Sequence, residues 1–348
     1  MSVSLNNTIN LPYAVMQCPM LGVTTPAMVA CVSNNGGIGS LPLGGTTAEQ
    51  ADKLISETKS LTNRPFIANL FLHPIVEIQN DNYIKAQKKI SQLTNDIGFD
   101  YTLQTNFNQI SYKDLLPILK KYNVKLIAFT FGCLTEDEIH TLHNDGCTLI
   151  GTATTIEEVT YLKDHKIDII LLQGIEAGGH RGSFLEESET KQLSLKDLFE
   201  KAKSLYPNIP YITVGGLKDG EEGKMYLDKG ALMAGYGSLF LASEESDAPN
   251  FQKNILAKGL PLDTVLTKAF SGKWARGIKN DFITQIESLI KDIPPFPIQN
   301  QLTGQMRVFA KENNFPAFYS MWSGVNGHYA QKKRTEEIFN QLIKEIYG

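Results

Sequence analysis

The chain has 348 residues, of which 42% are hydrophobic and 20% are charged, and this composition is typical of a soluble globular protein rather than a disordered or fibrous one. A net charge of -4 argues against a broad phosphate-binding surface, so we expect no nucleic-acid partner. The length predicts either two domains or one large barrel.

Short β-rich runs alternate with helix-like stretches along the chain. We expect eight of these runs to form strands, at residues 13–16, 66–70, 101–104, 125–129, 148–152, 168–172, 211–214 and 232–235. Predicted helices lie between them, at residues 26–34, 113–122, 136–144, 156–165, 195–206 and 220–229. Eight such units with apolar strands predict a parallel sheet closed into a (β/α)₈ TIM barrel, with a doubly wound open sheet as the alternative.

Two stretches, at residues 73–98 and 244–315, are too long and too polar to fit this alternation of strands and helices. Segments of this length usually cover a functional site. We therefore expect a barrel at residues 1–243, a smaller inserted cover domain on the substrate side at 244–315, and a C-terminal segment at 316–348 that returns to the barrel. The apolar spacing at residues 334–347 predicts a closing amphipathic helix.

Glycines follow directly after the predicted sixth, seventh and eighth strands, where barrels bind their ligands. The sequence QGIEAGGHRG occupies residues 173–182, Gly215 and Gly216 follow the seventh strand, and GYGS occupies residues 235–238. Paired glycines let the backbone approach a ligand and turn its N–H groups toward an anion. Two such loops on adjacent strands favour a bound phosphorylated cofactor over plain tight turns, and the helix that follows is expected to contribute its positive N-terminal end.

His180 follows Gly178 and Gly179 on the loop beside this expected phosphate site. An ordinary imidazole pKa of about 6.5 would make it a usable base near neutral pH, and we favour that role over a structural one. Arg181 could clamp an anion or pair with a carboxylate such as Glu176, and the sequence does not decide between the two.

Two further residues are candidates at strand ends. Met20 could pack in the core or lie along a flat aromatic ring, and the Asn69 amide could bond a heterocycle edge or a neighbouring loop. Lys273, Trp274 and Arg276 could line the cover and attract an anionic substrate, or could be structural or solvated.

Together these segments resemble the nitronate monooxygenase family, formerly called 2-nitropropane dioxygenase, from about residue 10 to residue 325. The matching segments include TTPAMVACVSNNGGIGSL (24–41), AFTFG (128–132), QGIEAGGHRGSF (173–184), VGGLKDG (214–220), AFSGKWARGI (269–278), FPIQNQLT (296–303) and MWSG (321–324). The resemblance implies an FMN-containing barrel with a cover domain. It also implies oxidation of alkyl nitronates by O₂ to carbonyl compounds and nitrite, with neutral nitroalkanes left open as substrates.

The resemblance assigns roles by position. His180 corresponds to the catalytic histidine, and the flavin contacts correspond to Met20, Asn69, Gln173, Gly178, Gly179, Gly215, Gly216, Gly235, Tyr236, Gly237 and Ser238. The family usually has Gln at the position of Gly235 and Thr at that of Ser238, so the resemblance implies that one side-chain contact to the flavin is lost here and one hydroxyl is kept. Thr130 stands where some members carry a second active-site histidine, and Glu221 adds negative charge near the expected phosphate.

Two other functions remain open. An FMN-dependent enoyl-[acyl carrier protein] reductase is a related barrel with a similar glycine–histidine loop, and it would need NAD(P)H. A non-catalytic barrel that binds a phosphorylated ligand belongs to a different class. The segments SGKWARGI and MWSG favour the monooxygenase over the reductase.

The cysteines and the N-terminal sequence help to predict where in the cell the protein is found. Cys18, Cys31, Cys133 and Cys147 form no CxxC pair, so neither a zinc site nor a dithiol redox site is expected. No basic segment followed by an apolar one opens the sequence, and no run of 18 or more apolar residues occurs in it. We expect a cytoplasmic protein without a membrane partner, and a homodimer remains an option.

Overall fold

Eight parallel strands form a closed barrel in the computed structural model, which describes residues 3–5, 9–76, 80–185, 192–289 and 293–348. Around the barrel the strand order is β10, β11, β3, β4, β5, β6, β7 and β8. Their bounds are β3 Val15–Gln17, β4 Ile38–Pro42, β5 Ile67–Phe71, β6 Leu126–Thr130, β7 Thr148–Ala153, β8 Ile169–Gln173, β10 Tyr211–Val214 and β11 Met233–Tyr236. The predicted (β/α)₈ barrel is therefore confirmed, and the open sheet is excluded.

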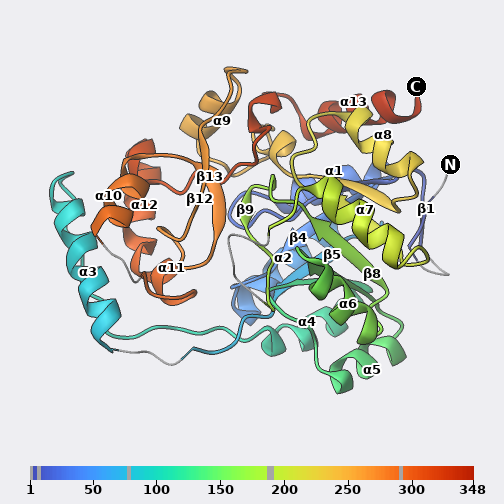
Figure 1. The fold of residues 1–348 in the computed structure, drawn as a ribbon, viewed down its shortest axis with the longest axis horizontal. Coiled ribbons are helices and arrows are strands. Elements are labelled where there is room, and N and C mark those ends of the chain that lie inside the picture. Colours follow the sequence, from blue (N-terminus) through green and yellow to red (C-terminus); the bar gives the residue numbers. More distant parts are fainter. Residues whose placement is uncertain (1–2, 6–8, 77–79, 186–191, 290–292) are drawn as a thin grey trace.

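Helices surround the barrel (Figure 1). Their side chains form a hydrophobic core with the outward-facing side chains of its strands. The helices are α1 Pro26–Asn34, α2 Ala48–Leu61, α4 Leu116–Lys121, α5 Glu136–Asn144, α6 Ile156–Asp164, α7 Leu195–Leu205, α8 Gly220–Asp228 and α13 Thr335–Tyr347. Alternate strand residues point inward and fill the barrel, among them Met16, Ile67, Ile150, Ile212 and Met233. The two-residue strands β1 Val3–Ser4 and β2 Asn10–Leu11 pair antiparallel next to this inner core.

One of the eight predicted strands was wrong and one real strand was missed. Residues 101–104 are not a strand: they extend across the cover, where the Tyr101 hydroxyl donates to the Leu302 carbonyl at 2.9 Å. The missing strand is β4, whose five residues are all buried. Its Gly39 has a packing reason, because a Cβ there would lie 2.4 Å from the Val29 carbonyl oxygen of α1.

A second hydrophobic core lies beside the barrel, and Figure 1 shows its helices gathered on one side of the molecule. Its elements are α3 Asn80–Asn95, α10 Asp281–Leu289, α11 Ile298–Leu302 and α12 Gly304–Glu312, with the nearby strands β12 Thr264–Thr267 and β13 Ala275–Ile278. The segment around α3 thus packs with residues between 269 and 318, far from it in the sequence. We call this part the cover, and the boundaries at residues 243 and 315 stay a proposal.

A short strand, β9 Gly179–His180, joins the two parts. It belongs to the loop after β8, yet it pairs antiparallel with β13 in the three-stranded sheet β12–β13–β9. The remaining short elements are α9 Asn250–Leu256 and the 3-10 turns η1 Tyr112–Asp114, η3 Ser238–Phe240, η4 Pro316–Phe318 and η5 Gly327–Tyr329. None of the helices in the described ranges has the length and apolar character needed to cross a membrane.

Candidate active site

A cavity of about 380 Å³ lies at the carboxyl ends of the barrel strands, with cover residues forming part of its wall. Of the twelve residues predicted for the site, eleven line it; they are Met20, Asn69, Gln173, Gly178, Gly179, His180, Gly215, Gly216, Gly235, Gly237 and Ser238. Tyr236 does not line it. Its side chain packs outside the barrel, where the hydroxyl donates to the Asp219 carbonyl at 3.1 Å.

His180 is held in the cavity by strand pairing and by aromatic rings. Its backbone pairs with Ala275 of β13, and its ring centroid lies 5.5 Å from that of Trp322, 5.7 Å from that of Phe296 and 5.9 Å from that of Phe131. The Nε2 atom is buried and has no hydrogen-bond partner among the described residues. An unsatisfied buried nitrogen that borders a cavity is available to a ligand.

The surroundings of His180 change its acidity. Burial, with smaller contributions from the charges of Lys273 and Arg307, lowers its pKa from 6.5 to about 3. The ring is therefore neutral at physiological pH and a weaker base than the ordinary value near 6.5 predicts. A neutral imidazole can still accept a proton at one nitrogen and donate a hydrogen bond from the other.

Gln173 fixes the loop that carries His180. Its side-chain amide donates to the His180 carbonyl at 3.0 Å, and its side-chain oxygen accepts from the Gly182 N–H at 2.8 Å. The two Gln173 bonds close the loop from 173 to 182 onto the end of β8.

Arg181 does not line the cavity, so it does not clamp an anion there; it forms no direct ion pair among the described residues, although the charges of Glu158 and Glu176 act on it. It is 1% exposed, and its guanidinium donates to the backbone carbonyls of Gly174 and Gln173, with the second contact at 3.0 Å. Arg181 therefore stabilises the loop after β8 by its hydrogen bonds to the backbone of Gln173 and Gly174.

A row of polar side chains crosses the mouth of the barrel. The Asn69 amide donates to the Thr130 hydroxyl at 3.3 Å, and that hydroxyl lies 3.3 Å from the hydroxyl of Thr152. All three side chains line the cavity, so this row can offer donors and acceptors to a bound ring system. The next residue after Thr130, Phe131, has φ +74°, an unusual conformation for a non-glycine residue that places its ring against His180.

The loops after β10 and β11 present free backbone donors. Gly215 and Gly216 have φ of +120° and +75°, and a Cβ at Gly216 would lie 2.6 Å from the Glu176 Cβ, so glycine is needed there. Within the described ranges, no hydrogen bond involves the N–H groups of Gly216, Gly237 or Ser238. Unpaired N–H groups that border a cavity suit an anion such as a phosphate.

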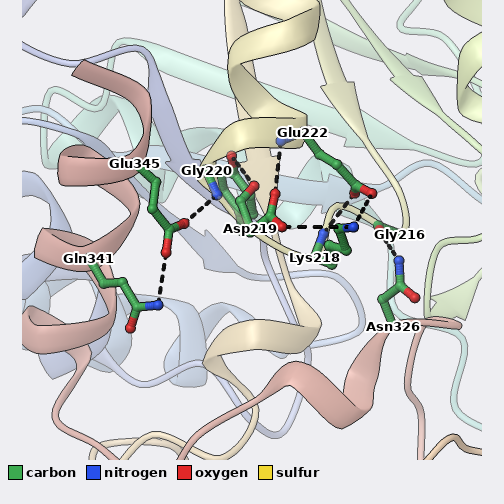
Figure 2. Close-up of polar contacts among 9 residues, drawn as sticks. Gly216, Lys218, Asp219, Gly220, Glu222, Asn326, Gln341 and Glu345 are labelled. Atoms are coloured by element: carbon green, nitrogen blue, oxygen red, sulfur yellow. Dashed lines mark hydrogen bonds and ion pairs between the residues drawn. The ribbon is translucent and has the colours of Figure 1, made fainter. Parts of the chain in front are cut away.

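The N-terminus of α8 does not contribute to this donor set, contrary to the sequence-based expectation. Figure 2 shows its first turn closed by carboxylates. Asp219 accepts from the Glu222 N–H at 2.8 Å, Glu222 accepts from the Lys218 N–H at 3.0 Å, and Glu345 of α13 accepts from the Gly220 N–H at 2.6 Å. The positive end of this helix is therefore already compensated within the protein.

Gly235 faces a crowded part of the wall. A Cβ at this position would lie 2.5 Å from Val214 Cγ1 and 3.0 Å from Cys18 Sγ. Because Val214 and Cys18 take up the space, a long side chain cannot enter here without rearrangement.

The segment MWSG closes the cavity against the glycine loop. The Gly324 N–H donates to the Ser238 hydroxyl at 2.9 Å, and a Cβ at Gly178 would lie 2.4 Å from the Gly324 nitrogen. Ser238 thus keeps its hydroxyl in the wall as a partner of the protein backbone.

None of Lys273, Trp274 and Arg276 lines the cavity. Lys273 donates to the Ser183 carbonyl at 3.0 Å and lies 4.9 Å from the centre of the Phe131 ring. Arg276 donates to the Ile175 carbonyl at 3.0 Å. These positions favour the structural alternative for Lys273 and Arg276.

Sequence reasoning missed the cover residues of the site, chiefly Asn300, Arg307 and Tyr319. Arg307 lies on α12, one turn after Thr303 and one turn before Ala310, both of which are buried. A single arginine in register with the apolar face of a helix was the signal that could have identified it.

Comparisons with known proteins cover the whole chain. A sequence model of a family described as "NMO: Nitronate monooxygenase" matches residues 3–346. A probable nitronate monooxygenase of Bacillus subtilis (strain 168) is 35% identical over 338 residues, covering 97% of this chain and 96% of the relative. One of Staphylococcus haemolyticus is 31% identical over 348 residues, covering 98% and 96%.

Solved structures agree with the fold. The nitroalkane oxidase from Streptomyces ansochromogenes is 28% identical with a TM-score of 0.89, covering 97% of this chain and 96% of that one. FabK from Thermotoga maritima is 22% identical with a TM-score of 0.73, covering 97% and 93%, and this likeness shows a shared fold alone.

Proposed function

The chain belongs to the nitronate monooxygenase family and is an oxidoreductase, and from that premise we propose that it uses FMN and O₂ to convert alkyl nitronates into carbonyl compounds and nitrite. The observation that carries the proposal is the unpartnered Nε2 of His180. His180 lines the same cavity as Gly216, Gly237 and Ser238, whose N–H groups have no hydrogen-bond partner among the described residues. One cavity thus offers both a site for a phosphorylated cofactor and a group that can act on a substrate.

The residues around the cavity fit FMN. The three free N–H groups would hold its phosphate, and no carboxylate lines the described part of the wall to repel it. Met20 on one side, with the polar row that begins at Asn69 on the other, would hold a flat ring with polar edges. The volume of about 380 Å³ falls in the range of roughly 300–1,000 Å³ seen for ligand sites. Bound there, FMN supplies the electron transfer between substrate and O₂.

The side chains around the cavity bind and orient the substrate and exclude water from it. The neutral ring of His180, with its proton on Nε2, donates to an oxygen of a nitronate; with the proton on the other nitrogen, Nε2 accepts the α-proton of a neutral nitroalkane. Because burial keeps the pKa of His180 near 3, the second task is the harder one, and we infer that nitronates are the preferred substrates. Phe131 and Trp322 shield the ring from solvent.

The cofactor assignment is tested on the purified protein before any substrate is added. We expect a flavin absorption spectrum, and chromatography of the heat-released cofactor should identify FMN. A colourless protein that takes up no added FMN would support the non-catalytic binding barrel instead.

A further inference from the structure

Arg307 is a charged residue without a counterion in the active-site cavity. Its Nε is buried and has no hydrogen-bond partner, and no ion pair involves its guanidinium among the described residues. No Asp, Glu or Lys is among the described residues that line the cavity. Burial lowers the pKa of Arg307 to about 10, so its charge persists at neutral pH. A guanidinium with a buried, unpartnered nitrogen and no carboxylate nearby is costly, and such a site favours a bound anion.

The protein holds this guanidinium in place without neutralising it. Its Nη2 donates to the backbone carbonyl of Asn300 and to the side-chain oxygen of Asn300, the latter at 2.9 Å. Asn300 is the last-but-two residue of α11, and Arg307 follows on α12, so two adjacent helices of the cover fix the geometry. One edge of the planar group is thus anchored, which leaves Nε for a ligand.

Arg307 and His180 line the same cavity but come from different parts of the fold. Arg307 comes from the cover and His180 from the loop after β8, yet both line the cavity, and the charge of Arg307 lowers the pKa of His180. Both carry a buried nitrogen without a partner. A planar oxyanion bound in this cavity therefore has two candidate partners in the wall.

We propose that Arg307, oriented by Asn300, forms with His180 the receptor for the oxyanion of the substrate, so that the cavity selects nitronate anions over neutral nitroalkanes. This inference rests on the proposed function, because it names the group on the substrate that the site binds. The cofactor phosphate is the other anion expected here, and the free N–H groups of Gly216, Gly237 and Ser238 already provide for it.

Nitrate is a suitable probe, since it is planar, carries one negative charge and is not turned over. Its binding to the purified flavin-loaded protein is measured by titration calorimetry. We expect Arg307→Gln to weaken nitrate binding by about 10- to 100-fold, the effect of losing a hydrogen-bonded charge. Lys311→Gln removes the same charge from an exposed position on α12 and should bind nitrate like the wild type.

A second variant keeps the test valid if Arg307→Gln fails to fold. Asn300→Asp retains the shape of the side chain and places a carboxylate on the guanidinium, so nitrate binding should fall although Arg307 remains. The proposal is overturned if the wild type binds no nitrate, if both Arg307→Gln and Asn300→Asp bind it normally, or if Arg307→Gln loses its flavin, because Arg307 would then hold the cofactor phosphate. Nitrate binding needs no turnover, so failure of the catalytic proposal would be seen separately, as absence of nitrite release.

Discussion

The side-chain amide of Gln173 donates to the backbone carbonyl of His180 at 3.0 Å, so the last residue of β8 fixes the position of the proposed catalytic residue. The same amide accepts from Gly182 through its oxygen, and both bonds are internal to the loop. The family resemblance implies that Gln173 contacts the flavin. The geometry supports a different main role, as a positioning residue for His180.

Substitution of Gln173 separates these two roles. Gln173→Glu can still accept from Gly182 but has no donor for His180, and Gln173→Leu loses both bonds. With a nitronate as substrate, we expect kcat to fall by about 5-fold in the first variant and further in the second, because each bond is worth about 1 kcal/mol. KM and the flavin content should stay close to those of the wild type; loss of the flavin with unchanged kcat per bound flavin would show that Gln173 serves the cofactor instead.

His180→Asn distinguishes proton removal from hydrogen bonding. Asn can donate to the oxygens of a nitronate but cannot accept an α-proton, so nitroalkane turnover should fall by about 100-fold or more and nitronate turnover by about 10-fold or less. Parallel initial rates with one nitroalkane and its own preformed nitronate measure the difference. Equal loss of both activities would refute the base role.

The pH dependence follows from the lowered pKa of His180. Since protonation becomes important only as the pH falls toward about 3, the ring stays neutral throughout the physiological range. We expect kcat/KM for a preformed nitronate, mixed rapidly from alkaline stock, to be level from about pH 6 to about pH 9. If kcat/KM instead changes with a midpoint near pH 6.5, and this change is absent in His180→Asn, then His180 titrates normally.

Much of this fold is readable from local sequence signals, and the errors have physical causes. Strands such as β8 are short apolar runs bounded by turns, and these were found. Strand β4 was missed because its residues IGSLP contain Gly39 and Pro42, which local propensity disfavours, while burial on both sides stabilises them. Residues 101–104 have strand-like composition, but their backbone and side chains are satisfied by the cover rather than by a sheet.

Local sequence signals likewise identify some residues of the candidate site and not others. The glycine loops and His180 are continuous in sequence and carry their own signal, so they were predicted. Arg307 and Asn300 enter from helices more than 100 residues further along the chain, and no local pattern connects them with His180. The low pKa of His180 also depends on burial by Trp322 and other distant residues, which the sequence does not reveal.

We expect any side chain added at Gly235 to lower the free energy of unfolding. Gly235→Ala places a Cβ 2.5 Å from Val214 Cγ1, and overpacking of this kind lowers the free energy of unfolding by about 1–3 kcal/mol. Gly304→Ala is the matched control, because a Cβ there meets no atom within 4 Å. Urea unfolding should show a smaller cost of Gly235→Ala in a Val214→Ala background; the same cost in both backgrounds would show that Val214 is not the obstacle.

Nitrite release shows whether this protein oxidises nitronates without a nicotinamide donor. The purified, flavin-loaded protein is supplied with propionate 3-nitronate in air without NADH, and nitrite formation and oxygen consumption are followed together. We predict that nitrite appears, that oxygen is consumed, and that His180→Asn slows both. No nitrite above the rate without enzyme, together with NADH oxidation driven by an enoyl thioester, would exclude the proposed monooxygenase and identify a reductase.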